Sequence, residues 1–184
     1  PLDNYDNVLK FLLLLSHKDG NNFSLRHVSL STCGLVPKIY ELAELKLGLT
    51  LCISLHSSDN SSRSEIMPVN RTYNIEALIE ACKHYISATG RRITFEYAVM
   101  DNVNSAEKDA DRLAELLRGI NCHVNLIPVN KVKERKYTTA RTAVAEFAKR
   151  LEKRGINATV RRTLGSDIEA ACGQLRRDAH EQSE

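Results

Sequence analysis

One short segment near the end of the chain combines a cysteine with the neighbours that a reactive thiol needs. Residues 165–176 read Gly-Ser-Asp-Ile-Glu-Ala-Ala-Cys-Gly-Gln-Leu-Arg, with Cys172 at the centre. Small residues on both sides would let another molecule approach the sulfur, and a cysteine thiolate is a strong nucleophile. The alternative is a buried cysteine before a glycine that ends a helix, because free cysteine is among the most buried residue types. The segment by itself favours this structural alternative.

A second group of candidate residues lies where three predicted strands end. The group consists of Ser31, the tripeptide Ser54-Leu55-His56, and Asn130. Hydroxyl and backbone groups at 54–56 could hold the carboxylate or ribose of a nucleotide-like ligand, and an asparagine amide suits an adenine edge. The alternatives are polar residues that cap the next helix or bond their own backbone, and an asparagine that forms a turn.

Positive charge gathers in the last third of the chain. Residues 131–136 read Lys-Val-Lys-Glu-Arg-Lys, followed by Tyr137, and arginine pairs stand at 161–162 and 176–177. These cations could contact RNA phosphates, and Tyr137 could stack on a base. A solvated charged loop is the alternative for each residue taken alone. The net charge of +3 permits an RNA partner without requiring one.

Strands and helices alternate along the chain and would have to position these residues. The predicted strands are 26–31, 49–56, 92–100, 123–129 and 157–162, the predicted helices are 4–17, 36–45, 75–88, 105–118 and 139–154, and 57–63 is a predicted loop. This alternation predicts an α/β fold with a parallel sheet that curves into a barrel or opens as a fan. Ligands of such sheets bind beyond the carboxyl ends of the strands, where the second group lies.

Composition excludes several classes of protein. A chain of 184 residues with 42% apolar and 27% charged residues is typical of a globular domain. Five widely spaced cysteines do not predict a disulfide framework, and no apolar run is long enough to span a membrane. With no signal peptide, a cytoplasmic location is predicted. The chain starts at Pro1 and not at Met, so it is interpreted as a fragment.

Four stretches, in order, resemble one known family. Residues 170–175, Ala-Ala-Cys-Gly-Gln-Leu, resemble the C-terminal signature of the RlmN/Cfr family of radical S-adenosylmethionine (SAM) enzymes, which methylate adenine in ribosomal RNA. The upstream matches are 29–34 (Ser-Leu-Ser-Thr-Cys-Gly), 53–56 (Ile-Ser-Leu-His) and 122–130 (Cys-His-Val-Asn-Leu-Ile-Pro-Val-Asn). Together they cover nearly the whole chain and are more similar to RlmN than to Cfr.

The resemblance implies a role for each candidate residue. In such a protein Cys172 accepts a methyl group, and SAM is contacted by Ser31, Ser54, Leu55, His56 and Asn130. The family also holds a [4Fe-4S] cluster on a Cys-x3-Cys-x2-Cys motif, which this chain lacks. The implied architecture is a partial radical SAM barrel without its first strands over 1–162, followed by a C-terminal segment over 163–184 that carries the methyl-accepting cysteine.

The implied function is that of a dual-specificity methyltransferase acting on adenine C2 in 23S ribosomal RNA and in transfer RNA. Its Cys172 thiolate takes a methyl group from one SAM, and a radical made from a second SAM at the cluster activates that methyl group for addition to the adenine. The full-length protein is expected to be a monomer, and this chain alone is expected to be inactive. The alternatives are an inactive truncated remnant and a non-catalytic RNA-binding α/β fragment.

Overall fold

A computed structural model describes residues 1–129 and 141–161 of the chain. Its centre is a sheet of five parallel strands in the order β1-β2-β3-β4-β5. The strands are β1 (Ser29–Thr32), β2 (Thr50–Ser54), β3 (Ile93–Val99), β4 (Cys122–Pro128) and β5 (Ala158–Val160). Sequential order with parallel pairing means that each strand is added on the same side of the last, as in a (βα) barrel. This topology confirms the predicted parallel α/β fold.

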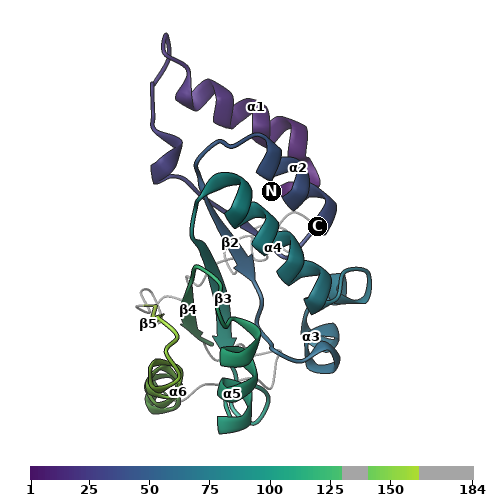
Figure 1. The fold of residues 1–184 in the computed structure, drawn as a ribbon, viewed down its shortest axis with the longest axis vertical. Helices are drawn as coiled ribbons and strands as arrows, with labels where there is room; N and C mark the ends of the chain where they lie inside the picture. Colours follow the sequence, from purple (N-terminus) through teal and green to yellow (C-terminus); the bar gives the residue numbers. More distant parts are fainter. Residues whose placement is uncertain (130–140, 162–184) are drawn as a thin grey trace, which may run out of the picture.

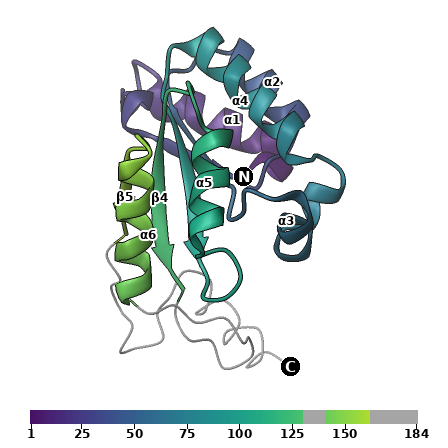
Figure 2. The same ribbon diagram turned by 60° about the horizontal axis from the view of Figure 1, so that its bottom comes forward.

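Six α-helices accompany the sheet in the described part of the chain. They are α1 (Tyr5–Ser16), α2 (Val36–Glu44), α3 (Asn60–Ile66), α4 (Ile75–Thr89), α5 (Glu107–Leu116) and α6 (Arg141–Lys153), with short 3-10 turns at Leu2–Asn4, Leu25–His27 and Pro68–Arg71. Figure 1 shows α2 and α4 side by side near β2. Figure 2 shows α5 and α6 beside β4, where these two helices pack against each other. None of the helices in the described ranges is long and apolar enough to cross a membrane.

The two faces of the sheet differ in chemistry. In β2, Leu51 and Ile53 are fully buried, whereas the alternating residues Cys52 and Ser54 are only half-buried. The mostly apolar sequence of residues 49–56 predicts a strand buried on both faces with Cys52 in the core; this prediction is wrong, because the face that carries Cys52 is only half-buried. The helices cover one face and form the core with it, while the other face carries the shorter polar side chains.

The core was predictable where helical spacing was regular. On α4, Ile75, Leu78, Ile79 and Cys82 are all buried, as their spacing indicated. Burial raises the pKa of the Cys82 thiol to about 12, so this cysteine stays protonated and is unsuited to nucleophilic chemistry at neutral pH. The helical spacing of Cys82 with these apolar residues predicts a core position, and the structure confirms it.

The stretch predicted as the loop 57–63 contains the start of a helix. Asp59 caps α3, because its carboxylate accepts a hydrogen bond of 3.0 Å from the Ser62 backbone N–H. The helix is short and rich in serine, so it shows no apolar periodicity from which it could be predicted. It buries Arg63 completely instead of an apolar face.

Candidate functional site

Two of the predicted residues meet through a third that the sequence did not single out. The hydroxyls of Ser31 on β1 and Ser54 on β2 both donate to the same carboxylate oxygen of Glu96 on β3, at 3.0 and 3.4 Å. Ser54 and Glu96 are partners in the register of neighbouring strands. The structure therefore brings the last residues of β1 and β2 together with the middle of β3 around one half-buried carboxylate.

Leu55 and His56 turn the chain away from the end of β2. Both backbone N–H groups donate to the main-chain carbonyl of Glu96, at 3.0 and 3.2 Å. The Leu55 side chain is fully buried, so only its backbone is available to a ligand. His56 adopts a left-handed backbone conformation with φ of 58°, which is uncommon for a residue other than glycine. A strained residue of this kind at a strand end is typical of a functional position.

The imidazole of His56 has a defined protonation state. Its Nδ1 accepts a hydrogen bond of 3.1 Å from the Ala98 backbone N–H, so in the neutral ring Nε2 carries the proton. Burial lowers the pKa of His56 to about 4; the Glu96 carboxylate opposes this shift and the Arg63 cation adds to it. At neutral pH His56 therefore offers one N–H donor and no charge.

A buried asparagine holds His56 in place. The Asn104 side-chain amide donates to the carbonyls of His56 and Ala98, at 2.8 and 2.7 Å, and its oxygen accepts from the Met100 N–H at 2.7 Å. One side chain thus ties the end of β2 to the end of β3. The residues between the predicted strand 92–100 and the predicted helix 105–118 gave no sign that Asn104 reaches across to β2.

The half-buried face of the sheet extends this polar surface. Its residues alternate along each strand and match across the register. Ser29 and Thr159 are exposed, and the half-buried members are Ser31, Thr50, Cys52, Ser54, Thr94, Glu96, His123 and Asn125. Asn125 lies next to Glu96 in this register, and His123 is bonded to Thr159 at 2.8 Å. Hydroxyl, amide and carboxylate groups in such an array suit a ligand with hydroxyl and amino groups.

The described cysteines do not form a metal centre. Cys33, Cys52, Cys82 and Cys122 are free, and within 1–129 and 141–161 no three histidine, cysteine or acidic side chains are grouped closely enough to hold a metal ion. Burial raises the pKa of Cys122 to about 11. An iron–sulfur cluster needs grouped thiolates. The described part of the chain therefore does not fit such a cluster.

Two of the predicted site residues, Asn130 and Cys172, lie outside the described residues. The proposed C-terminal segment 163–184 lies outside them as well. Their roles, like those of the serines and His56 as ligand contacts, stay predictions.

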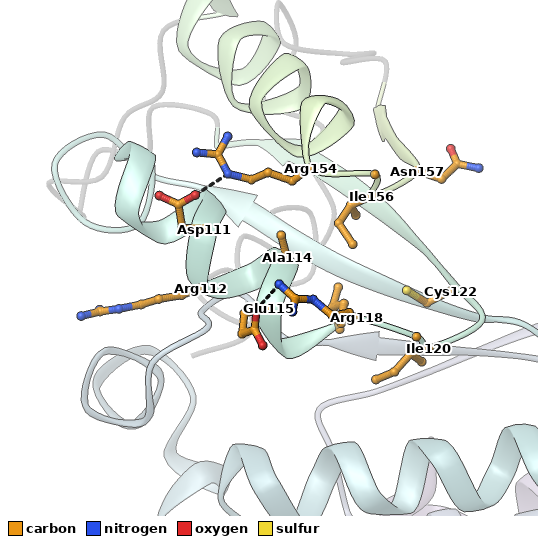
Figure 3. Close-up of a pocket in the computed structure, with 13 residues that line it drawn as sticks. Asp111, Arg112, Ala114, Glu115, Arg118, Ile120, Cys122, Arg154, Ile156 and Asn157 are labelled. Atoms are coloured by element: carbon orange, nitrogen blue, oxygen red, sulfur yellow. Dashed lines mark hydrogen bonds and ion pairs between the residues drawn. The ribbon is translucent and has the colours of Figure 1, made fainter.

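A pocket of about 680 Å³ lies at the other end of the sheet, between α5, α6 and the start of β4. Figure 3 shows Arg154 directed at Asp111, and Arg118 at Glu115, along its wall. Cys122, the first residue of β4, also lines it. The pocket is thus next to the amino end of the strand, whereas the predicted residues gather at the carboxyl ends.

Comparisons with known proteins agree with the resemblance. No family model matches the chain. A probable dual-specificity RNA methyltransferase RlmN from Clostridium beijerinckii is 54% identical over 96% of this chain and 50% of its own length. The protein of the same name from Clostridium botulinum (strain Alaska E43) is 53% identical, over 96% of this chain and 51% of its own length. The crystal structure of a radical SAM methyltransferase from Sphaerobacter thermophilus is similar with a TM-score of 0.90 and 43% identity, over 95% of this chain and 51% of that one.

The chain spans about half the length of the curated relatives it matches, and it corresponds to their C-terminal part. The structural similarity confirms that its parallel sheet is of the radical SAM type.

Proposed function

We propose that this chain, which matches the C-terminal part of RlmN, supplies the SAM-binding strand ends of a dual-specificity RNA methyltransferase. The observation that supports this most directly is the convergence of Ser31 and Ser54 on the Glu96 carboxylate, at the end of the sheet where parallel α/β folds bind ligands. The two serines belong to the stretches 29–34 and 53–56, which resemble the family.

SAM has hydroxyl, ammonium, carboxylate and adenine groups, and the proposed site has a counterpart for each kind. Glu96 can accept hydrogen bonds from ribose hydroxyls or from an ammonium group, and the hydroxyls of Ser31 and Ser54 can turn to a ligand. The neutral His56 can donate a hydrogen bond through Nε2. Leu55, between Ser54 and His56 in the sequence, can offer only its backbone groups to the ligand. Asn130 is proposed to add an amide. When bound, SAM supplies an activated methyl group on a sulfonium centre.

Cys172 is proposed to accept that methyl group. Its thiolate, formed by loss of the thiol proton to solvent, attacks the methyl carbon; a new carbon–sulfur bond forms as the bond to the sulfonium breaks, leaving S-adenosylhomocysteine. The support is the Ala-Ala-Cys-Gly sequence, whose small residues would let SAM approach the sulfur. Alternative roles as thiolate nucleophiles are disfavoured for Cys82 and Cys122, because burial raises both pKa values.

The proposed substrates are adenines of ribosomal and transfer RNA, so the protein would work in the cytoplasm. The [4Fe-4S] cluster of this family is assigned to cysteines outside this chain, because the described cysteines do not group. Anaerobic reconstitution of these 184 residues with iron and sulfide should accordingly give no brown chromophore. Stoichiometric iron and sulfide in the reconstituted chain would contradict the assignment.

The proposed function is tested with a full-length enzyme that carries this chain. The reconstituted enzyme, SAM and a reductant are incubated with 23S ribosomal RNA or with transfer RNA, and the nucleosides are analysed by mass spectrometry. We expect 2-methyladenosine in both RNAs. No methylated adenosine in either RNA, from enzyme with a full cluster content, would overturn the proposal.

A further inference from the structure

Arg63 is a fully buried cation that is not among the predicted site residues. It extends from α3 into the interior and is 0% exposed. Its Nε donates to the Leu55 carbonyl at 3.0 Å, and Nη2 donates to the carbonyls of Cys33 and Ser54 at 2.8 and 3.2 Å. Nη1 donates to the Asn70 side-chain oxygen at 2.8 Å. Every one of these acceptors is neutral.

The charge of this arginine has no counter-ion in the described part of the chain. No carboxylate there lies within ion-pair distance of Arg63, and burial lowers the pKa of the guanidinium. Burying a cation without an anionic partner is unfavourable unless its donors are satisfied by well-placed acceptors. A cation buried in this way points to a task other than stability.

The acceptors of Arg63 belong to the turns that carry the proposed site. Cys33 lies two residues after Ser31, at the end of β1, and Ser54 and Leu55 are themselves predicted contacts. The planar guanidinium therefore fixes the end of β1 relative to the end of β2. Those are the two strands whose serines share the Glu96 carboxylate.

The surroundings hold the guanidinium in a single position. Asn70, which accepts from Arg63, donates to the backbone and side-chain oxygens of Asn60, both at 3.1 Å, and to the Ser64 hydroxyl at 2.9 Å. Gly34 approaches from the β1 turn with φ of +108°, and a side chain there would lie 3.1 Å from Leu78 and 3.5 Å from Arg63. The guanidinium is thus held by Asn70 on one side and by the turn at Gly34 on the other.

We propose that Arg63 is a positioning residue for the SAM site: it clamps the carboxyl ends of β1 and β2 through their main-chain carbonyls, so that Ser31, Ser54 and His56 face the ligand together. This inference rests on the proposed function for the identity of the ligand. Arg63 itself acts through the backbone of the two turns and not by touching the ligand.

The chain contains a matched control at the opposite end of the same two strands. Arg91 is half-buried and donates to the Arg26 carbonyl at 3.3 Å and to the Thr50 hydroxyl at 3.1 Å. It joins the segment before β1 to the first residue of β2. Replacing Arg91 thus removes a similar bridge, but at the amino ends of the strands.

The first experiment compares the variants Arg63→Met, Arg63→Lys and Arg91→Met of the full-length enzyme with the parent. The dissociation constant of S-adenosylhomocysteine is measured by calorimetry, and folding is followed by thermal melting. We expect Arg63→Met to bind about tenfold more weakly or worse, because small displacements of a binding group are costly, and Arg91→Met to bind as the parent does. Arg63→Lys should bind weakly as well, since a single ammonium cannot span the carbonyls; it keeps the test possible if Arg63→Met fails to fold.

Equal binding by the parent and both Arg63 variants would overturn the inference, and so would an equal loss in Arg91→Met. A parent enzyme that does not bind the probe would instead overturn the proposed function. In that case the ring-nitrogen NMR signals of His56 in this chain test whether Arg63 positions the end of β2. We expect Arg63→Met, or Arg63→Lys if Met does not fold, to disturb the His56 ring signals, and Arg91→Met to leave them unchanged. Unchanged His56 signals in the Arg63 variant would show that Arg63 positions nothing at this site.

Discussion

The two ends of the sheet use their charged residues in opposite ways. At the amino end, around the pocket of Figure 3, Arg154 pairs with Asp111 and Glu107, and Arg118 pairs with Glu115. At the carboxyl end, the Glu96 carboxylate accepts from the hydroxyls of Ser31 and Ser54, and the Arg63 guanidinium donates to neutral oxygens. The charges of the first region neutralise each other. In the second region the charges of Glu96 and Arg63 are not neutralised by ion pairs among the described residues and can act on a ligand.

The difference shows how a binding site can be recognised without a ligand. Exposed ion pairs such as those of Arg154 join α5 to α6 and are screened by solvent. At the carboxyl end, buried side chains such as Arg63 and Asn104 bond to the main chain and hold the strand ends in a fixed arrangement. Preorganised polar groups with unused hydrogen-bonding capacity are the mark of a site built for recognition.

The largest expected effect concerns the proposed methyl acceptor. Cys172→Ala in the full-length enzyme should abolish RNA methylation, because no other side chain supplies a thiolate there, while folding and SAM binding persist. Mass spectrometry after turnover should find a methyl group on the parent peptide that contains Cys172.

The matched control is Cys82→Ala in the core. It should lower the free energy of unfolding by about 1–2 kcal/mol, as buried large-to-small changes do, and leave methylation measurable. An active Cys172→Ala enzyme would remove Cys172 from the mechanism.

The next effect tests whether the carboxyl end is the ligand end. Glu96→Gln keeps the shape of the side chain but removes the carboxylate that organises Ser31 and Ser54. We expect SAM to bind about tenfold more weakly, since hydrogen bonds to charged groups contribute about 1.5–3 kcal/mol. Glu80→Gln on α4, which breaks an exposed pair with Lys83, is the control and should bind SAM as the parent does. Unchanged affinity in Glu96→Gln would place the ligand elsewhere.

A pH effect on stability should follow from the neutral state of His56. Its pKa is lowered from about 6.5 in the unfolded chain to about 4 in the fold, so the unfolded state binds the proton first as the pH falls. Stability from this residue is fully present above pH 6.5 and is lost progressively between about pH 6.5 and 4, by on the order of 3 kcal/mol.

This expected pH effect takes the neighbouring charges into account: the Glu96 carboxylate opposes the lowering of the His56 pKa, and the Arg63 cation adds to it. Urea unfolding at a series of pH values measures the effect, and His56→Asn is a suitable comparison because asparagine tolerates a left-handed backbone. A parent and a variant with the same pH profile would show that His56 is not held neutral.

The smallest effect is expected at the amino end. Arg154→Ala breaks exposed contacts with Asp111 and Glu107, whose charges are well solvated. The melting temperature should stay within about 3 °C of the parent, and SAM affinity should not change. A clear loss of SAM binding in Arg154→Ala would mean that the two ends of the sheet are coupled, and the contrast between them would fail.

The amino-acid sequence by itself determined the order of the strands and of the longer helices and the parallel sheet, and its motifs indicated the resemblance to the RlmN/Cfr family. Regular apolar spacing located α4 and its core residue Cys82, and the strand-end position of Ser54 and His56 followed from alternation along the chain. The motif segments indicated the resemblance because several short patterns in a fixed order are specific to one family, even without coordinates. These features are local, so they are visible in the sequence.

The tertiary structure alone decided which residues meet. Ser31 and Glu96 are 65 positions apart and come together only because of the register of three strands. Glu96 on a strand and Arg63 in a serine-rich stretch leave no periodic signal, since each is placed by long-range pairing and not by a local apolar face. The uncovered face of the sheet also became clear only in the fold, because the mostly apolar run 49–56 obscures the alternation of Leu51 and Ile53 with Cys52 and Ser54.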